Sequence, residues 1–111
     1  FENLGIGYLM ALCLEQDHEV DFVYYQAEDQ YLERKIKKMP YDQIAQRITN
    51  TKPDFVAFSC VTDNYQFQLQ CARAFKKISP ATITVFGGIH VTSIPDRVIS
   101  NAEVDCICIG E

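Results

Sequence analysis

The stretch FVAFSC, residues 55–60, is short and almost continuously apolar. A strand that is covered on both faces, as in a parallel sheet between layers of helices, has this composition. The stretch KPD, residues 52–54, precedes it, and proline disfavours helical geometry in the residue before it. Residues 55–60 are therefore predicted to form a buried strand, from which the neighbouring elements can be placed.

Helical and strand patterns alternate along the rest of the chain. The predicted helices are residues 4–16, 41–51, 64–78 and 94–101, and the further strands are residues 20–25, 83–86 and 104–109. This alternation predicts an α/β fold with a Rossmann-like (flavodoxin-like) parallel sheet and helices on both faces. Because such a domain ordinarily begins with a strand and this sequence begins with a helix, the first strand is expected to lie before Phe1.

Length, charge and cysteine content limit what the chain can be. Its 111 residues fit one domain, and the net charge of −5 argues against a nucleic-acid binder, which needs clustered positive charge. No apolar run reaches the ~20 residues that span a membrane. The five cysteines lack CxxC spacing, which favours free, buried thiols and a reduced cytoplasmic compartment. Cys106 and Cys108 alternate along one predicted strand, so they are expected to share a face and to pack in the core.

Ligands bind beyond the carboxyl ends of the strands in open parallel sheets. Three of these predicted ends are small, polar or glycine-rich: residues 59–65, 87–92 and 110–111. This composition predicts a rim that faces a ligand. No residue of the rim has the pattern of a catalytic group.

Five residues of this rim are the sharpest candidates. Gly87 and Gly88 offer bare backbone on which a flat ligand can lie, although a tight turn with positive φ needs the same residues. Ser59 and Thr62 offer hydroxyls to a ligand, with capping of the next helix by Thr62 or its neighbours as the alternative. His90 is expected to make a polar contact to ligand and not to bind a metal, because no second His or Cys stands at metal-ligand spacing.

In order and spacing, these segments resemble the N-terminal cobalamin-binding domains of radical S-adenosylmethionine (SAM) enzymes. Within that family, the resemblance is to the group of the anaerobic magnesium-protoporphyrin IX monomethyl ester cyclase and the radical SAM methyltransferases. It rests on residues 4–9, 17–20, 53–56, 87–92, 104–105 and 109–111 with Ser59, Thr62, Tyr65 and Pro95. The resemblance implies cobalamin with its corrin over the carboxyl ends of the strands and its nucleotide tail beside the sheet. The implied cofactor-binding residues are Leu4, Gly5, Ser59, Val61, Thr62, Gly87, Gly88, His90, Gly110 and Glu111.

The resemblance also implies a longer protein. A radical SAM domain, with a 4Fe-4S cluster and S-adenosylmethionine, is expected downstream of this single domain of residues 1–111. The parent is expected to catalyse methyl transfer or an oxidative cyclisation, while this chain, which lacks the three-cysteine motif of the cluster, binds cobalamin. Asp17-His18-Glu19 is not the Asp-x-His-x-x-Gly motif whose histidine binds cobalt in other cobalamin domains, so the lower axial ligand stays open.

Two other functions fit an α/β domain of this kind. A response-regulator-like module needs a phosphoacceptor aspartate at a strand end, where Asp63 lies, and a lysine after the last strand, where none follows residues 104–109. A flavin- or nucleotide-binding module needs a phosphate-binding loop after the first strand, which would precede Phe1.

Overall fold

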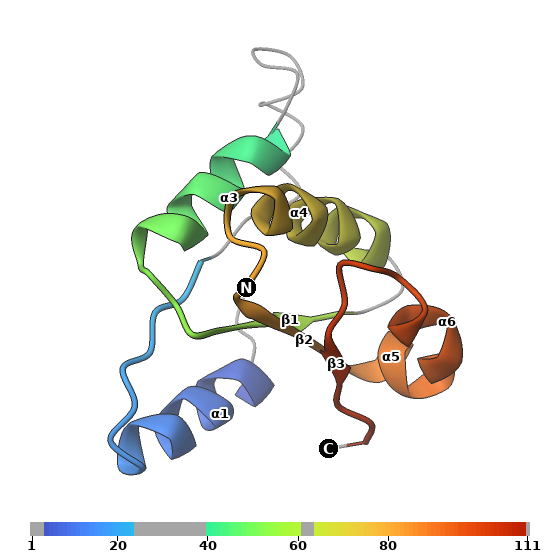
Figure 1. The fold of residues 1–111 in the computed structure, drawn as a ribbon. Coiled ribbons are helices and arrows are strands. Elements are labelled where there is room, and N and C mark those ends of the chain that lie inside the picture. Colours follow the sequence, from blue (N-terminus) through green and yellow to red (C-terminus); the bar gives the residue numbers. More distant parts are fainter. Residues whose placement is uncertain (1–3, 24–39, 61–63, 111) are drawn as a thin grey trace.

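The computed structural model describes residues 4–23, 40–60 and 64–110. Its elements in chain order are α1 (Leu4–Glu15), α3 (Pro40–Asn50), β1 (Phe55–Ser59), α4 (Tyr65–Ile78), β2 (Ile83–Gly87), α5 (Ile89–Ser93), α6 (Pro95–Ile99) and β3 (Cys106–Ile107). The strands form one parallel sheet in the order β1-β2-β3, with helices on either side of it (Figure 1). The predicted α/β fold with a parallel, Rossmann-like sheet is confirmed.

The register of the sheet brings the ends of β1 and β2 level with each other. Phe55 pairs with Ile83 and Ser59 pairs with Gly87, while β3 joins the other edge of β2 through Val85. Consecutive parallel strands need a crossover, which α4 provides between β1 and β2. The carboxyl ends of these two strands therefore form one continuous rim.

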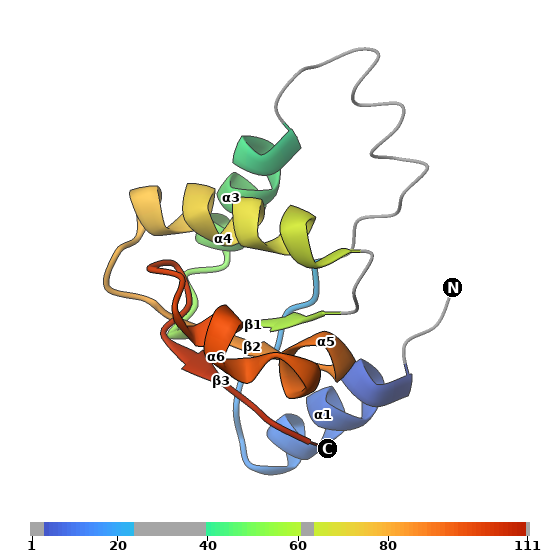
Figure 2. The same ribbon diagram turned by 90° about the vertical axis from the view of Figure 1, so that its right-hand side faces the viewer.

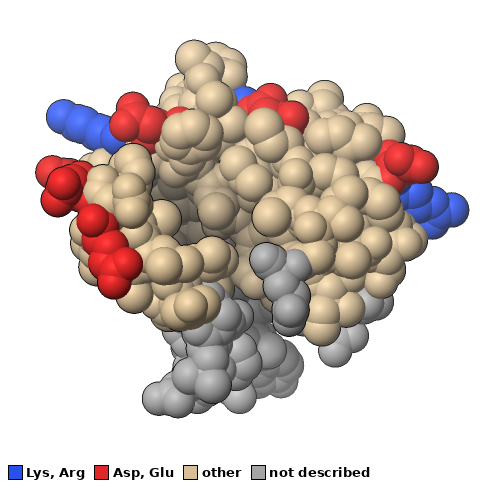
Figure 3. All heavy atoms as spheres, turned by 90° about the horizontal axis from the view of Figure 1, so that it is seen from below, with Lys and Arg blue, Asp and Glu red and all other residues tan. Residues whose placement is uncertain are grey.

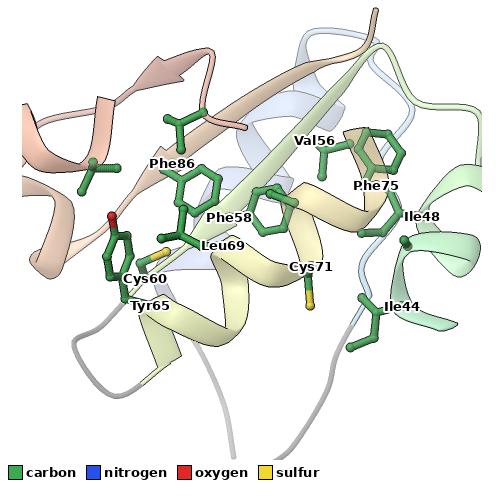
Figure 4. Close-up of a cluster of buried hydrophobic side chains, with 14 of the residues drawn as sticks. Ile44, Ile48, Val56, Phe58, Cys60, Tyr65, Leu69, Cys71, Phe75 and Phe86 are labelled. Carbon is green, nitrogen blue, oxygen red and sulfur yellow. The ribbon is translucent and has the colours of Figure 1, made fainter. Parts of the chain in front are cut away.

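One face of the sheet and one side of α4 form the hydrophobic core. Side chains alternate in direction along a strand, so Val56, Phe58 and Phe86 point to the same side. There they pack with Leu69 and Phe75 of α4, and α3 packs against the outer side of α4 (Figure 4). The rings of Phe58 and Phe86 stack with their centroids 4.7 Å apart. A fully buried phenylalanine contributes about 1.5–3 kcal/mol, so this cluster holds the rim in place.

The opposite face of the sheet carries no buried side chain, and we call it the open face. It consists of Phe55, Ala57 and Ser59 of β1, Ile83, Val85 and Gly87 of β2, and Cys106 and Cys108 at β3. The helix α1 lies on this side, away from α3 and α4, in both ribbon views (Figures 1 and 2). Several of its apolar side chains nevertheless stay exposed, Tyr8 by 70% and Leu9 by 62%. Thus α1 lies near the open face without covering it.

Two ion pairs connect α4 to the end of the sheet at which the strands begin, which we call its amino-terminal edge. The Arg73 guanidinium donates to the Glu103 carboxylate at 2.8 Å. Lys76 donates to the Asp105 carboxylate, which also accepts a hydrogen bond from the Thr84 backbone N–H at 2.9 Å. These contacts join α4, β2 and the segment before β3, at the edge that faces away from the rim.

Several predicted elements differ from those observed. Residues 20–23 of the predicted strand 20–25 are not in a strand, and residues 24–25 lie outside the described part of the chain. The last predicted strand, residues 104–109, shortens to Cys106–Ile107, the two residues that have Cα partners in β2. The predicted helix 94–101 is α6, and it follows the short α5, which occupies residues predicted to be rim loop. Local pattern identifies apolar runs, whereas pairing depends on what lies beside them.

Candidate functional site

The rim at the carboxyl ends of β1 and β2 is held together by backbone hydrogen bonds. The Cys60 N–H donates to the Gly87 carbonyl at 2.8 Å, and the His90 N–H donates to the Cys60 carbonyl at 3.4 Å. The Gln68 side-chain amide of α4 donates to the Ser59 carbonyl at 2.9 Å. The start of α5 is thus tied to the end of β1, and both strand ends are fixed against α4.

Gly88 occupies a position that the backbone reserves for glycine. Its φ is +109°, and a Cβ there would lie 2.4 Å from the Cys60 carbonyl oxygen and 2.9 Å from the Cys60 nitrogen. No side chain fits at either distance, and positive φ is strained for any L-residue. The tight turn weighed for this pair therefore explains why position 88 requires glycine, and contact of Gly88 with a ligand stays a prediction.

Gly87 differs, because its missing side chain leaves space on the open face. A Cβ at Gly87 would meet the Cys108 Cβ at 3.5 Å and the Cys108 carbonyl oxygen at 3.7 Å, which are ordinary van der Waals distances. Ser59 pairs with Gly87 from the other side and is half-buried. Ser59, Gly87 and Cys108 therefore form a row across the open face, and we call the space over Gly87 the Gly87 gap.

The side chains next to this row on the open face are small and uncharged. Ala57, Val85 and Cys106 form the next row, one pleat further from the rim. Figure 3, which views the molecule from the α1 side, shows Asp, Glu, Lys and Arg towards the margins of the described surface and other residues around a hollow left of its centre. Such a surface suits a bulky, largely uncharged ligand better than a phosphate-rich one.

His90 lies behind the rim, packed on an aromatic ring. Its imidazole centroid is 4.2 Å from that of Tyr65, with the rings tilted by 41°. The Asn101 amide donates to the Tyr65 hydroxyl at 3.2 Å, which ties α4 to the end of α6. No group of three His, Cys, Asp or Glu side chains that could hold a metal ion occurs in the described part of the chain. The imidazole of His90 thus packs on Tyr65 next to the rim, and its predicted polar contact to a ligand stays a prediction.

The structure brings one further predicted site residue, Gly110, to the same end of the molecule. The Thr92 hydroxyl of α5 donates to the Gly88 carbonyl at 3.1 Å and accepts from the Gly110 N–H at 3.0 Å. Gly110 has a φ of +85° and open space where a Cβ would be. Thr92 thereby links two predicted site residues.

Other predicted site residues have only a partial description. Leu4 and Gly5 belong to the first turn of α1, on the side of the open face. Val61, Thr62 and Glu111 lie outside the described residues. Asn64 occupies the N-cap position of α4 but makes no side-chain cap hydrogen bond there.

Cysteine placement corrects one expectation. Cys60 and Cys71 are buried as expected, and burial raises the pKa of each thiol to about 12. Cys106 and Cys108 were predicted to pack in the core, yet both are exposed on the open face, as Cys13 is on α1. The alternation of Cys106 and Cys108 correctly predicts one shared face. Which of the two faces is covered depends on where α4 packs, and the strand pattern does not contain that information.

A shallow depression of about 430 Å³ lies at the opposite, amino-terminal edge of the sheet. It is lined by the charged groups of the two ion pairs, Arg73 with Glu103 and Lys76 with Asp105, together with Lys77, Pro80 and Ala102. Because four of its charges are already paired, this depression offers little to a ligand.

No helix in the described ranges is long and apolar enough to cross a membrane.

Comparison with known proteins identifies the family to which the chain belongs. A family model described as B12 binding domain matches residues 1–111. The anaerobic magnesium-protoporphyrin IX monomethyl ester cyclase of Rubrivivax gelatinosus is 34% identical over 71 residues, which are 63% of this chain and 13% of that protein. The chain thus corresponds to a small part of that relative's length. No solved structure matches the chain.

Proposed function

The chain belongs to the B12-binding domain family, and from this premise we propose that it holds cobalamin at the carboxyl ends of β1 and β2, as the cofactor-binding module of a radical SAM enzyme. The observation that carries the proposed placement is the Gly87 gap. A Cβ at Gly87 would make only ordinary van der Waals contacts, to Cys108 at 3.5 and 3.7 Å, and the position lies at the rim of a parallel sheet, where ligands of such sheets bind.

The residues present fit such a ligand. Gly87 exposes bare backbone, and a side chain at that position would fill the space beside Cys108. Ser59 brings a hydroxyl to the same row and can donate to or accept from a polar group of the ligand. The fixed register of β1 and β2 makes this surface rigid, and preformed sites lose less entropy on binding.

In this proposal the residues of the chain bind and orient the cofactor. Ser59 and Gly87 contact it from the sheet, and Gly110 approaches it through backbone, held by Thr92. The family resemblance adds Leu4 and Gly5, in the first turn of α1, together with Val61, Thr62 and Glu111. Gly88 and His90 support the rim from below. When bound, cobalamin supplies a cobalt centre able to transfer methyl groups or to take part in one-electron chemistry.

The proposal extends to the parent protein. The cyclase relative supports a radical SAM domain, with a 4Fe-4S cluster and S-adenosylmethionine, as the partner that uses the cofactor for methyl transfer or an oxidative cyclisation. All five cysteines are free thiols, which supports a reducing, cytoplasmic location. The match to the B12-binding family favours this function over a response-regulator-like or flavin-binding module.

The proposal is tested by titrating the protein with hydroxocobalamin and following the visible spectrum, for the wild type, Gly87→Leu and Ala102→Leu. A leucine at Gly87 fills the gap at unstrained φ, so the Kd should rise about tenfold or more. Ala102→Leu adds the same bulk at the opposite edge and should bind like the wild type. Circular dichroism confirms that each variant is folded. A folded wild-type protein without saturable binding would refute the proposal.

A further inference from the structure

The five thiols fall into two classes. Cys60 and Cys71 are 0% and 3% exposed, and burial raises their pKa to about 12, so they are almost wholly protonated at neutral pH. Cys13, Cys106 and Cys108 are exposed. Because the thiolate is the reactive form, alkylation of the native protein should reach only the exposed class.

Cys108 occupies a particular place among the exposed thiols. Its backbone N–H donates to the Phe86 carbonyl at 2.8 Å, which continues the ladder of β3 beyond Ile107. This bond directs the Cys108 side chain to the open face, where its Cβ lies 3.5 Å from the Cβ position of Gly87. Cys108 therefore forms one wall of the Gly87 gap, and Ser59 forms the other. With neighbouring strands about 4.8 Å apart, the two walls stand roughly 10 Å from each other.

We propose that Cys108 is a cofactor-contacting residue of the cobalamin site, whose thiol lies against the part of the ligand seated over Gly87. This inference rests on the proposed function. A ligand group that occupies a gap of this width touches both walls, and Gly87 has no side chain to hold it away from Cys108. The size of residue 108 therefore sets how wide a group the site accepts.

The test measures shielding of the thiol and needs no catalytic activity. In Cys106→Ser, the remaining exposed thiols are Cys108 as reporter and Cys13 as internal reference. N-ethylmaleimide labelling of each is followed by peptide mass spectrometry with and without cyanocobalamin, whose cobalt-bound cyanide keeps protein thiols from replacing it. At about ten times the Kd, roughly one site in ten is free, so labelling of Cys108 should slow about tenfold while that of Cys13 is unchanged.

Bulk at position 108 gives a second readout. Cys108→Phe narrows the gap and should raise the Kd for cyanocobalamin about tenfold, whereas Cys13→Phe, which adds the same bulk at an exposed thiol of α1, should bind like the wild type. Equilibrium dialysis on the same samples shows whether the protein binds cyanocobalamin, independently of Cys108 labelling. Binding with undiminished Cys108 labelling would overturn this inference and leave the proposed function standing. Absence of binding by the folded protein would overturn both.

Discussion

Gly87 and Gly88 are neighbours in the sequence, yet the fold uses them differently. Gly88 takes a φ of +109° and lies against the backbone of Cys60, while Gly87 has ordinary space around its Cβ position. Gly88 is required by the turn that starts α5, whereas Gly87 leaves room on the open face. A residue-by-residue test can therefore separate folding from ligand binding.

Gly88→Ala is expected to destabilise the protein by at least about 2 kcal/mol, because it adds backbone strain to a clash with main-chain atoms that cannot move aside. Urea unfolding followed by circular dichroism measures the change. Gly87→Ala is the matched control and should stay within about 1 kcal/mol of the wild type, because its Cβ makes only ordinary contacts. Equal stability of the two variants would contradict this account of Gly88.

At the scale of elements, the amino-terminal edge of the sheet depends on Asp105. Its carboxylate accepts hydrogen bonds from Lys76 and from the Thr84 backbone, and these hold its pKa below the ordinary value of 3.8. Because β3 pairs with β2 over only Cys106 and Ile107, strand pairing gives the segment before it little support. Asp105 thus supplies polar contacts where β3 has few ladder bonds.

Asp105→Asn should lower the free energy of unfolding at pH 7 by about 0.5–1 kcal/mol, because the charge-assisted bond to Lys76 is lost and solvent screens this exposed pair. A carboxylate with a depressed native pKa stabilises the fold above its unfolded pKa of about 3.8, and this contribution disappears as the pH falls through the native value. The difference between wild type and variant should therefore shrink from pH 5 towards pH 3. Urea midpoints measured across that range would contradict the role of Asp105 if the difference stayed constant.

At the scale of the whole molecule, the two faces of the sheet have unequal cover. Phe75 and Phe86 are fully buried between the sheet and α4, whereas α1 presents Tyr8 and Leu9 to solvent. A helix that is apolar on all sides is ordinarily buried. The helix α1 has apolar residues on all sides, yet it has few packing partners among the described residues. Its stability should accordingly lie well below that of the core.

Amide hydrogen exchange of the protein without ligand should show this division. Residues of α4 and β2 are expected to exchange slowest, because opening them disrupts the core, and residues of α1 should exchange by local opening at far lower cost. Mass spectrometry of peptides after timed exchange measures the pattern. Protection of α1 as strong as that of α4 would show that the helix packs more tightly than its exposed side chains indicate.

Local sequence patterns were enough to place the strand that begins at Phe55, the long helix that follows, the parallel α/β order and the rim in which Ser59 and Gly87 lie. These follow from apolar periodicity and from turn residues, which act locally. Contacts between distant segments settle which face of the sheet α4 covers, and hence that Cys108 is exposed beside Gly87 while Cys60 is buried. They also settle that residues 20–23 stay outside the sheet and that Gly88 serves the backbone turn. These outcomes depend on contacts between segments distant in sequence, and no local pattern specifies such contacts.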